Sequence, residues 1–373
     1  MELETLRQQM DEVDGALLPL FLHRMDLSRA IAREKTRLGL PVQDRARERR
    51  LLAAVTEKSG RDGEYARLLY NSILEFSRSC QRLEMLPDRD PDLPAEEDTM
   101  FPRAASVACQ GVEGAYSQSA ADRAVPFADI TYFGTWEEVF RAVEEGQCRF
   151  GVLPIENSSH GSVLPVYDLL GSHRVFIVRS VRLHISHSLL ALPGTRLEDI
   201  TAITSHEQAI GQCSRFLSGL PGVEVRLCRN TAEAARTVAS GKEKTLAALS
   251  QESCAALYGL RILRRAVQNT DNNHTRFIVI EKEPRIYPGA SRVSLMFSTP
   301  HQPGSLASVL NRFSSMGVNL TKLESRPLEG SDFNYVFYAD LEASTRDPGI
   351  RKLLTSLKAD LPMFAFLGAY QEV

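Results

Sequence analysis

One stretch of the sequence reads Asn272-Asn273-His274-Thr275-Arg276-Phe277-Ile278-Val279-Ile280, a polar turn followed directly by an apolar run. Asparagines favour turns, and the β-branched and aromatic residues that follow are typical of a strand. The pattern places Thr275 and Arg276 next to each other where the strand begins. We therefore expect a hydroxyl and a fixed cation to face a buried anion at this point.

The chain around this stretch alternates between short β-rich runs and helical patterns from residue 104 to residue 284. The expected strands are Ser106–Cys109, Phe150–Pro154, Val175–Val181, Ile200–Thr204, Val223–Leu227, Leu246–Leu249 and Phe277–Glu281. The expected helices are Ser117–Ala124, Trp136–Glu145, Glu207–Leu217 and Thr231–Ala239. This alternation predicts an α/β fold.

The order of elements changes after residue 290. The expected elements are the strand Arg292–Ser298, the helix Ser305–Met316, the strands Leu320–Arg326 and Asn334–Ala339, the helix Pro348–Lys358 and the strand Ala365–Ala369. This βαββαβ order predicts a ferredoxin-like fold for residues 290–373.

Residues 2–38 carry an apolar stripe at helical spacing. Its members are Leu3, Leu6, Met10, Val13, Leu17, Leu20, Leu27 and Ile31. A helix of this length spans about 55 Å, and the two amphipathic helices expected at 43–59 and 63–86 are too short to cover it. We therefore expect an all-helical bundle that pairs with a second copy of itself as an intertwined homodimer. Pro19 lies inside the long helix and favours a kink.

Residues 87–103 alternate prolines with acidic residues, and both features oppose a packed core. A chain of 373 residues is too long for one compact core. We expect domains at 1–86, 104–284 and 290–373, with 87–103 as a linker between the first two.

The composition excludes several classes of function. A formal net charge of -3 lacks the positive excess that nucleic-acid binding needs. No apolar run is long enough to cross a membrane, and the acidic N-terminus differs from a signal peptide. The six cysteines form no CxxC pair, which indicates free, buried thiols in a reducing cytoplasm.

No motif points to a cofactor or a metal. The turn Gly111–Ser117 lacks the GxGxxG spacing and the P-loop lysine of nucleotide sites. His184 and His187 fall in one strand-like run, where they point to opposite faces. We therefore expect neither a cofactor nor a metal ion.

Polar residues interrupt the apolar faces of the N-terminal helices. Arg24 falls on the stripe, and Lys35 lies eleven residues on, nearly three whole turns, so it points the same way. The other inward polar positions are Asp44, Arg47 and Glu48 on the second helix, and Ser77 and Gln81 on the third. A lone inward arginine is compatible with a structural ion pair, and Asp44 is equally suited to cap a helix. Their combination exceeds what a plain bundle needs.

This set resembles the active site of the all-helical chorismate mutases over about residues 3–85. The resemblance implies that Arg24, with Asp44, Arg47 and Ser77, binds chorismate. It assigns Lys35 and Gln81 to the ether oxygen and Glu48 to a substrate hydroxyl. The rearrangement of chorismate to prephenate needs only a compact conformer and stabilised charge, and arginines suit the two carboxylates.

Arg7 also matches the chorismate mutase pattern but lies far from Arg24 along the helix. The two residues are 17 positions apart, which corresponds to about 25 Å and a rotation of about 100°. Both side chains cannot reach one small substrate in a straight helix. Arg7 is therefore expected to serve the site of a partner subunit.

Two further turns accompany the opening stretch and the glycine turn, namely Leu153–Ser162 and Thr204–Ala209. Together they resemble the motifs of prephenate dehydratases, which implies a cleft between two α/β lobes and conversion of prephenate to phenylpyruvate. The resemblance implies Thr275 as proton donor and Arg276 as a carboxylate ligand. The remaining substrate-binding residues it implies are Glu156, Asn157, Ser205, Gln208 and Phe277. His206 and His274 are the alternative acids.

The C-terminal segment resembles the phenylalanine-binding ACT regulatory domains. The matching positions are Gly304, Ser305 and Leu306 after the first strand, and Glu324, Ser325 and Arg326 at the end of the second. The stretch Gly-Ser-Leu-Ala departs from the usual Gly-Ala-Leu-Val, which puts the affinity for a ligand in question. The alternative is a dimerisation module without a ligand.

Taken together, the chain resembles the bifunctional chorismate mutase/prephenate dehydratases that carry an ACT domain. This resemblance implies chorismate and prephenate as substrates, L-phenylalanine as inhibitor, and a homodimer or higher homo-oligomer. One alternative is a monofunctional dehydratase whose helices only dimerise. Another is a non-catalytic amino-acid sensor, because two-lobed α/β folds and ACT domains also occur in binding proteins.

Overall fold

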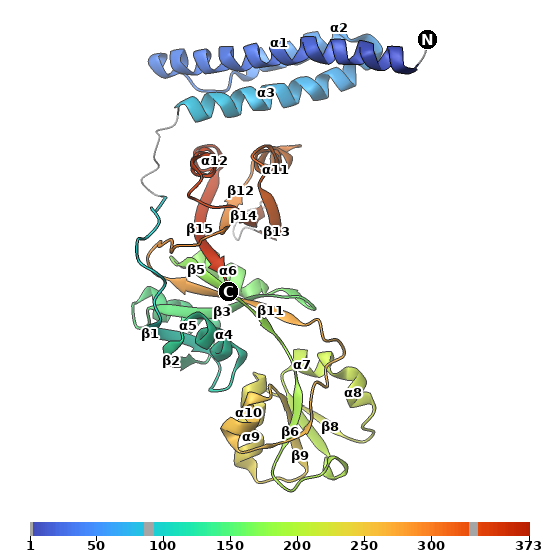
Figure 1. Ribbon diagram of the computed structural model, residues 1–373, viewed down its shortest axis with the longest axis vertical. Helices are drawn as coiled ribbons and strands as arrows, with labels where there is room; N and C mark the ends of the chain where they lie inside the picture. The colour runs from blue at the N-terminus through green and yellow to red at the C-terminus, as the bar shows by residue number, and fades with distance from the viewer. Residues whose placement is uncertain (1–2, 86–92, 328–334) are drawn as a thin grey trace. The chain divides into compact units, whose positions relative to one another are not determined.

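The computed structural model describes residues 3–85, 93–327 and 335–373. The chain divides into two compact units, each assembled from segments that are distant in the sequence (Figure 1). The first consists of Met1–Leu93, Thr299–Gly317 and Asp347–Pro362, and the second of Pro94–Ser298, Val318–Arg346 and Met363–Val373.

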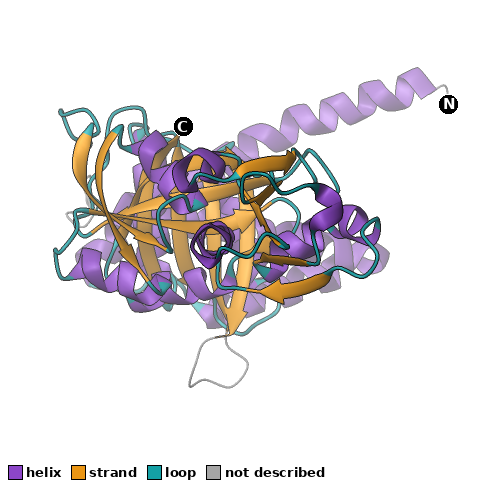
Figure 2. Cartoon of the chain, turned by 90° about the horizontal axis from the view of Figure 1, so that it is seen from below, coloured by secondary structure: helices purple, strands orange, loops and turns teal. Residues whose placement is uncertain are grey.

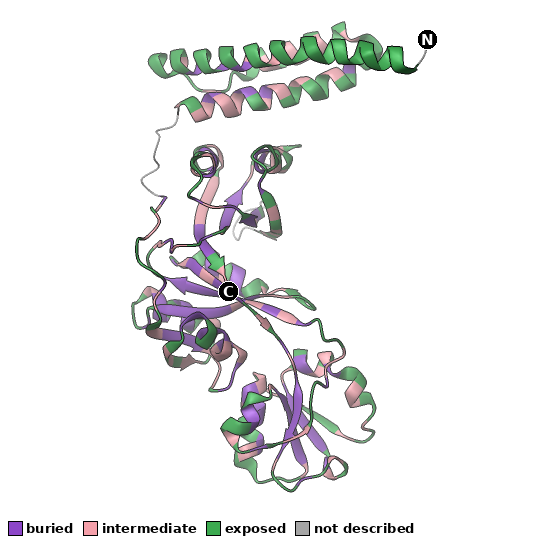
Figure 3. Ribbon diagram, in the orientation of Figure 1, coloured by how far each residue is buried: buried purple, intermediate pink, exposed green. Residues whose placement is uncertain are grey.

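The first unit begins with three helices, α1 (Leu3–Leu38), α2 (Arg45–Lys58) and α3 (Gly63–Met85). The expected helices are confirmed, and α1 continues through Pro19. Only Met25, Ser28 and Ala32 of α1 are buried, whereas the apolar stripe of its first half is exposed (Figure 3). The helices α11 (Ser305–Ser315) and α12 (Pro348–Asp360) belong to the same unit.

The second unit contains a ten-stranded sheet with the path β13-β14-β12-β15-β5-β11-β3-β1-β2, and β4 pairs with β3. The strands of its α/β lobe are β1 (Ala104–Gln110), β2 (Phe127–Phe133), β3 (Phe150–Asn157), β4 (Gly161–Ser162), β5 (Phe176–His184) and β11 (His274–Glu281). The helices of this lobe are α4 (Tyr116–Ala124), α5 (Trp136–Glu144) and α6 (Leu164–Ser172). In the central strand β3, five of the eight residues are buried, which its apolar run favours.

A second α/β lobe is built on a five-stranded sheet with the order β10-β6-β9-β7-β8, and several of its elements are labelled in Figure 1. Figure 2 distinguishes the helices of the chain from its strands by colour. The strands of this lobe are β6 (Ser188–Ala191), β7 (Ala202–Ser205), β8 (Glu224–Leu227), β9 (Leu246–Ser250) and β10 (Arg261–Arg264). Its helices are α7 (Glu207–Gln212), α8 (Ser214–Ser218), α9 (Thr231–Gly241) and α10 (Ser253–Tyr258). The two lobes of the predicted α/β fold are thus present.

Three local expectations differ from the structure. The single helix expected at Glu207–Leu217 is divided at Cys213, shortly after the poor helix former Gly211. His184 ends β5 and His187 lies in the connection before β6, so the two do not share one strand. Phe101, in the expected linker, is buried against Phe150 with ring centroids 5.1 Å apart.

The last four strands are β12 (Arg292–Ser298), β13 (Asn319–Pro327), β14 (Tyr335–Glu342) and β15 (Met363–Glu372). They pair antiparallel in the order β13-β14-β12-β15, and β15 then pairs in parallel with β5. Gly368 makes this junction possible, because a Cβ there would lie 2.0 Å from the carbonyl oxygen of Ile177. The C-terminal strands and the first lobe are therefore one continuous sheet.

All six cysteines are free, and Cys109, Cys148, Cys213 and Cys254 are buried. Burial raises the pKa of each of these four thiols. The expected free thiols are confirmed, although Cys80 and Cys228 are only partly buried.

Candidate active sites

The strands β3 and β11 sort four predicted site residues into two groups. Thr275 pairs with Asn157, and Arg276 pairs with Glu156, in one antiparallel ladder. Because successive side chains of a strand point to opposite faces, Thr275 and Asn157 share one face and Arg276 and Glu156 share the other. We call these the Thr275 face and the Arg276 face.

The Thr275 face holds a hydrogen-bond network that joins the two lobes. Nδ2 of Asn157 donates to Oγ1 of Thr275 and to Oδ1 of Asn273, both at 2.9 Å. Nδ2 of Asn273 donates to Oε1 of Gln212, on α7 of the second lobe, at 2.9 Å. The Thr275 side chain accepts a hydrogen bond from Asn157, so its own proton remains free to be donated to a bound molecule.

The backbone fixes Asn157 in turn. Its Oδ1 accepts hydrogen bonds from the backbone N–H groups of Ser159, at 2.9 Å, and His160, at 3.0 Å. Both amide ends of the Asn157 side chain are therefore occupied. Asn157 holds the buried Thr275 hydroxyl, whose residue is 8% exposed, in one orientation.

The other residues expected on this face have different surroundings. Ser205 is fully buried and its hydroxyl donates to the carbonyl oxygen of Leu249 at 2.7 Å. Gln208 is exposed in the first turn of α7. Phe277 is 3% exposed and packs in the hydrophobic core with Val181 and Val279. Of these three side chains, Gln208 is the one that remains accessible to a ligand.

Neither histidine proposed as an alternative acid is suited to donate a proton to the Thr275 face. His206 caps α7, where its Nδ1 accepts from the backbone N–H of Gln208 at 3.3 Å. Burial lowers the pKa of His206. His274 lies two residues from Arg276 and lines the pocket on that face. Burial, Arg182 and His184 lower the pKa of His274, so both rings favour the neutral form.

The Arg276 face is occupied by ion pairs. Nη2 of Arg276 lies 2.5 Å from Oδ2 of Asp340 and 3.4 Å from Oε2 of Glu156. Nζ of Lys322 lies 2.9 Å from Oε1 of Glu156. Burial opposes the charge of Arg276, but Asp340, Tyr370 and Tyr167 together outweigh this effect, so the pKa of Arg276 is raised. Its guanidinium therefore already has carboxylate partners, and the structure does not bring it together with the Thr275 hydroxyl.

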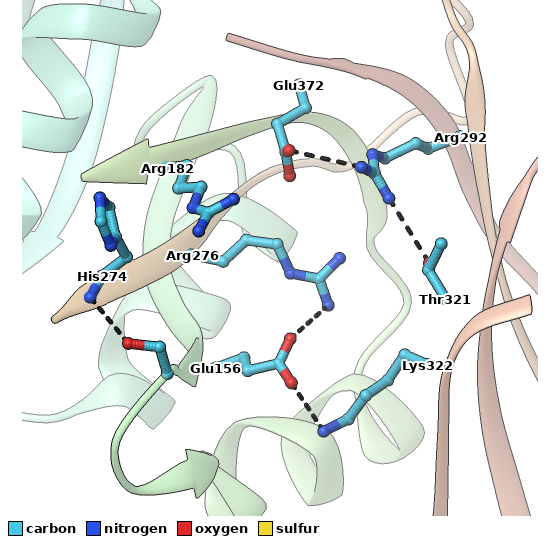
Figure 4. Close-up of a pocket in the computed structure, with 9 residues that line it drawn as sticks. Glu156, Arg182, His274, Arg276, Arg292, Thr321, Lys322 and Glu372 are labelled. Carbon is cyan, nitrogen blue, oxygen red and sulfur yellow. Dashed lines mark hydrogen bonds and ion pairs between the residues drawn. The ribbon is translucent and has the colours of Figure 1, made fainter. Parts of the chain in front are cut away.

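A cavity of about 270 Å³ lies beside these pairs (Figure 4). It is lined by Glu156, Ser158, Arg182, His274, Arg276, Arg292, Thr321, Lys322 and Glu372. Figure 4 shows Glu156 between Arg276 and Lys322, and Arg292 directed at Glu372. Four fixed cations line this cavity, and three of them, Arg276, Arg292 and Lys322, form ion pairs with acidic residues. The fourth is Arg182.

A second polar cluster lies within the N-terminal helices. Arg24 donates to the hydroxyl of Ser77, and Nζ of Lys35 donates to Oε1 of Gln81 at 3.2 Å and to the carbonyl oxygen of Val42. Ser77 and Gln81 are buried, at 5% and 8% exposure. Burial lowers the pKa of both Arg24 and Lys35. The structure thus brings together two cations and two neutral polar groups on facing helices.

The second helix contributes to this region through Glu48, which lies 2.7 Å from Arg78 of α3. Asp44 caps α2, with its Oδ1 accepting from the backbone N–H of Arg47 at 3.0 Å. The Arg47 side chain is exposed. The capping role considered for Asp44 is therefore present in the structure.

Arg7 stands apart from this cluster. Its guanidinium lies 3.7 Å from Glu4, one turn away on the same helix, and its side chain is 67% exposed. This position leaves Arg7 available to another molecule.

The regulatory candidates fall in both units. Gly304 caps α11 with a φ of +83°, and Ser305 and Leu306 begin that helix. Glu324 accepts from the hydroxyl of Ser162 at 2.5 Å, and Arg326 forms two hydrogen bonds with Asp168 of α6 at 2.7 and 2.9 Å. Ser325, between them on β13, is exposed.

Family models match two segments of the chain. Residues 107–285 match the prephenate dehydratase family, and residues 6–82 match the chorismate mutase type II family. The chain is 31% identical over 374 residues to the bifunctional chorismate mutase/prephenate dehydratase of Escherichia coli strain K12, covering 98% of this chain and 95% of that relative. The chain belongs to the bifunctional chorismate mutase/prephenate dehydratase family.

Other similarities cover about 71% of this family member. It is 38% identical over 281 residues to arogenate dehydratase/prephenate dehydratase 1 of Arabidopsis thaliana, over 71% of each chain. The solved prephenate dehydratase of Arthrobacter aurescens in complex with L-Phe has a TM-score of 0.65 and 26% identity, covering 71% of this chain and 90% of that one. The Thr275 face lies in the dehydratase match and the Arg24 cluster in the mutase match.

Two features are absent from the described part of the chain. No helix there combines the length and the apolar character needed to cross a membrane. No three or more His, Cys, Asp or Glu side chains gather there in an arrangement that can hold a metal ion.

Sequence reasoning missed several residues that the structure places at these clusters. They are Gln212 and Asn273 beside Thr275, Lys322 and Asp340 beside Arg276, and Arg78 beside Glu48. Strand alternation alone predicts that Thr275 and Arg276 separate. Nothing in the sequence links Asp340 to Arg276, because 64 residues separate them.

Proposed function

We propose that the chain catalyses two consecutive reactions, the rearrangement of chorismate to prephenate and the decarboxylative dehydration of prephenate to phenylpyruvate. The observation that carries this proposal is the presence of one polar cluster in each matched segment. Arg24–Ser77 and Lys35–Gln81 lie in the helices, and Asn157–Thr275 lies on two paired strands of the first α/β lobe. A helical bundle that only dimerises does not need the buried cations of the first cluster. An amino-acid sensor does not need a hydroxyl proton that can be donated at the second cluster.

The mutase reaction breaks the ether C–O bond of chorismate while a new C–C bond forms, without a nucleophile or a proton transfer. Arg24 binds a carboxylate and holds the compact conformer. Lys35 and Gln81 face the ether oxygen, where negative charge develops. Lys35 donates to Gln81 in the free protein, and both groups are turned to the oxygen when substrate is bound.

The helical active site is completed by a second copy of the chain. The exposed stripe of α1 includes Leu3, Met10 and Leu17, which are 63%, 62% and 53% exposed. A helix of this length gains stability when a partner covers such a stripe. The same partner supplies Arg7, so the proposed assembly is a homodimer or a larger homo-oligomer.

The dehydratase reaction expels the ring hydroxyl and the ring carboxylate of prephenate together. The C–C bond to the carboxylate breaks and releases carbon dioxide, its electrons form the aromatic ring, and the hydroxyl leaves as water after gaining one proton. Thr275, held in place by Asn157, supplies this proton and regains one from solvent water, so one proton is consumed in each turnover. Gln208 contacts the substrate from the second lobe. This step needs no metal and no cofactor.

We assign the C-terminal segment to regulation by L-phenylalanine. The support is its element order and strand order, β13-β14-β12-β15, which fit a ferredoxin-like ACT domain, and the L-Phe complex of the Arthrobacter relative. The residues assigned to the effector are Gly304, Ser305 and Leu306, with Glu324, Ser325 and Arg326. The proposed domain boundaries are 1–86, 104–284 and 290–373, and the enzyme acts in the cytoplasm.

Arogenate is a second candidate substrate for the α/β lobes. The Arabidopsis relative that shares 38% identity is named as both an arogenate and a prephenate dehydratase. Arogenate carries the same ring hydroxyl and ring carboxylate as prephenate and differs in its side chain. The Thr275 face acts on the shared part of the molecule, so turnover of both compounds must be compared.

The test is to incubate the purified protein with chorismate and follow prephenate and phenylpyruvate over time. Bifunctional activity predicts transient prephenate followed by phenylpyruvate. A monofunctional dehydratase leaves chorismate unchanged but consumes added prephenate. A sensor consumes neither, and preferential consumption of added arogenate identifies the second candidate.

A further inference from the structure

The two strands that hold the proposed dehydratase residues are also tied to the C-terminal strands. Thr275 and Asn157 lie on one face of β11 and β3, and their neighbours Arg276 and Glu156 lie on the other. Arg276 pairs with Asp340 of β14, and Glu156 pairs with Lys322 of β13. Each strand therefore carries a proposed site residue and, adjacent to it, a residue that forms an ion pair with the C-terminal strands. We call these two ion-paired residues, Arg276 and Glu156, the anchors.

The Arg276 anchor is buried and fixed from several sides. The side chains of Arg276 and Asp340 are only 12% and 10% exposed. Oδ1 of Asp340 also accepts from the hydroxyl of Ser294 at 2.6 Å, and this hydroxyl lies 2.8 Å from the hydroxyl of Tyr370. Groups from β12 and β15 thus fix the Asp340 carboxylate of β14, which in turn binds Arg276 of β11. Loss of Arg276 would leave this buried carboxylate without its cation.

The Glu156 anchor is more exposed and is continuous with the first. Glu156 lies between Lys322 at 2.9 Å and Arg276 at 3.4 Å (Figure 4). Lys322 also lies 3.6 Å from Glu324 on its own strand. A shift of β13 against the first lobe therefore acts on Glu156, and through β3 on the neighbouring Asn157.

We infer that Arg276 and Glu156 are positioning residues, which through Asp340 and Lys322 keep β11 and β3 in the register that aligns Thr275 with Asn157. This inference rests on the proposed dehydratase function of the Thr275 face. It replaces the expected contact of Arg276 with a substrate carboxylate and the expected place of Glu156 among the substrate-binding residues. It also connects the C-terminal strands to Thr275 through two side chains, those of Asp340 and Arg276, because Arg276 is the next residue after Thr275 on β11.

A third ion pair provides a matched control. Arg326 of β13 binds Asp168 of α6 at 2.7 Å, so it joins the same strand to the same lobe. The helix α6 carries none of the proposed catalytic residues. Asp168→Asn therefore removes an ion pair between the same two regions without affecting a strand of the site.

The experiment measures kcat and KM for prephenate, and backbone hydrogen exchange of residues 150–157 and 274–281, in the full-length protein. The variants are Glu156→Gln, Lys322→Met, the double variant, and Asp168→Asn. We expect Glu156→Gln and Lys322→Met each to lower kcat about tenfold with little change in KM, because a small displacement of a catalytic group is costly. The double variant is expected to resemble the single variants, because both changes break one interaction.

The exchange measurement judges the inference independently of turnover. Lys322→Met is expected to speed exchange in β3 and β11, and Asp168→Asn is expected to leave it near the wild-type rate. The conservative variant Lys322→Arg keeps a cation beside Glu156 and should retain most of kcat, which a purely local packing role does not predict. Asp340→Asn tests the Arg276 anchor in the same way and is expected to speed exchange in β11.

Three outcomes overturn the inference. If Glu156→Gln lowers kcat and Lys322→Met does not, Glu156 contacts substrate directly. If Asp168→Asn causes the same losses, the loss of any ion pair between β13 and the first lobe lowers kcat, and Glu156 has no specific role. If Lys322→Met leaves both kcat and exchange unchanged, the anchor has no positioning role. Absence of prephenate turnover in the wild-type protein contradicts the proposed function, and the exchange data then still decide whether the anchors hold the strands.

Discussion

The helical segment and the α/β lobes place their polar clusters in different surroundings. Near the Arg24 cluster, α1 buries three residues and leaves its apolar stripe exposed. Around Thr275, both lobes of one chain contribute hydrogen bonds. Five of the eight residues of β3 and all five of β9 are buried. This difference underlies our proposal that the mutase site needs a second chain, whereas the dehydratase site is complete within a single chain.

The largest effect that we predict is on the dehydratase side. Thr275→Ala removes the proposed donor and should lower phenylpyruvate formation about 100-fold to 10,000-fold, the usual range for a general acid. Prephenate should accumulate from chorismate, because the helical cluster is untouched. Steady-state assays with both substrates measure this separation.

Two variants control this result. Thr275→Ser keeps the hydroxyl and should retain part of the activity, and Thr237→Ala changes an exposed threonine of α9 and should have no effect. Near-normal turnover of Thr275→Ala would remove Thr275 as the acid.

The reciprocal change concerns the helices. Lys35→Ala should lower mutase activity about 100-fold or more, equivalent to about 3 kcal/mol, because it removes a charge facing the ether oxygen. Turnover of added prephenate should stay at the wild-type rate. Lys58→Ala, at an exposed lysine of α2, is the control. A mutase rate within a few-fold of wild type would contradict the role of Lys35.

The pH dependence should also separate the two regions. Burial lowers the pKa of Lys35, and mutase activity needs its charged form, so activity should fall as the pH rises through this lowered value. In the same window the unfolded chain binds more protons at Lys35 than the folded chain, so the contribution of Lys35 to the free energy of unfolding rises with pH. Activity and this contribution thus change in opposite directions.

Mutase rates between pH 7 and pH 10 test this prediction, with the Lys35→Arg variant as comparison. Arginine stays charged throughout, so the alkaline loss should disappear in that variant while the maximal rate falls. An unchanged alkaline loss in Lys35→Arg would assign it to another group.

A smaller effect is expected at the proposed regulatory site. Gly304→Val should weaken inhibition by L-phenylalanine about tenfold, within the range usual for allosteric coupling, with little change in uninhibited turnover. Gly304→Ala is the matched control, because it shares the strain of a side chain at φ +83° but adds less bulk near the ligand. Calorimetry and inhibition curves measure the effect, and equal behaviour of both variants would assign it to backbone strain.

The positions of the long helices and of most strands could be predicted because hydrophobic period decides them, although the bounds of several strands differ, such as those of β11 and β15. The strand Arg292–Ser298 was predicted at its observed bounds, and α1 was predicted to within one residue. Short elements such as β6 and α10 gave too few residues for a period to emerge. Local pattern thus predicts long elements better than short ones.

The site was predicted less completely than the fold. The Arg24–Ser77 and Lys35–Gln81 contacts join residues already chosen as candidates, because inward polar residues on a helix are visible in the sequence. The separation of Thr275 from Arg276 was missed, because neighbours in sequence were treated as neighbours around one ligand. The partner Asp340 required the pairing order of four distant strands, which no local pattern contains.

The central claim is that a second chain completes the mutase site and that one chain suffices for the dehydratase site. Its most direct test mixes two inactive variants in each arm and measures recovery after subunit exchange has been verified by mass spectrometry. For Arg7→Ala with Arg24→Ala, each mixed dimer has one intact mutase site, so about one quarter of wild-type activity should return. For Asn157→Ala with Thr275→Ala, no mixed assembly has an intact site and no dehydratase activity should return. Failure of the first pair to recover, or recovery by the second pair, would contradict the claim.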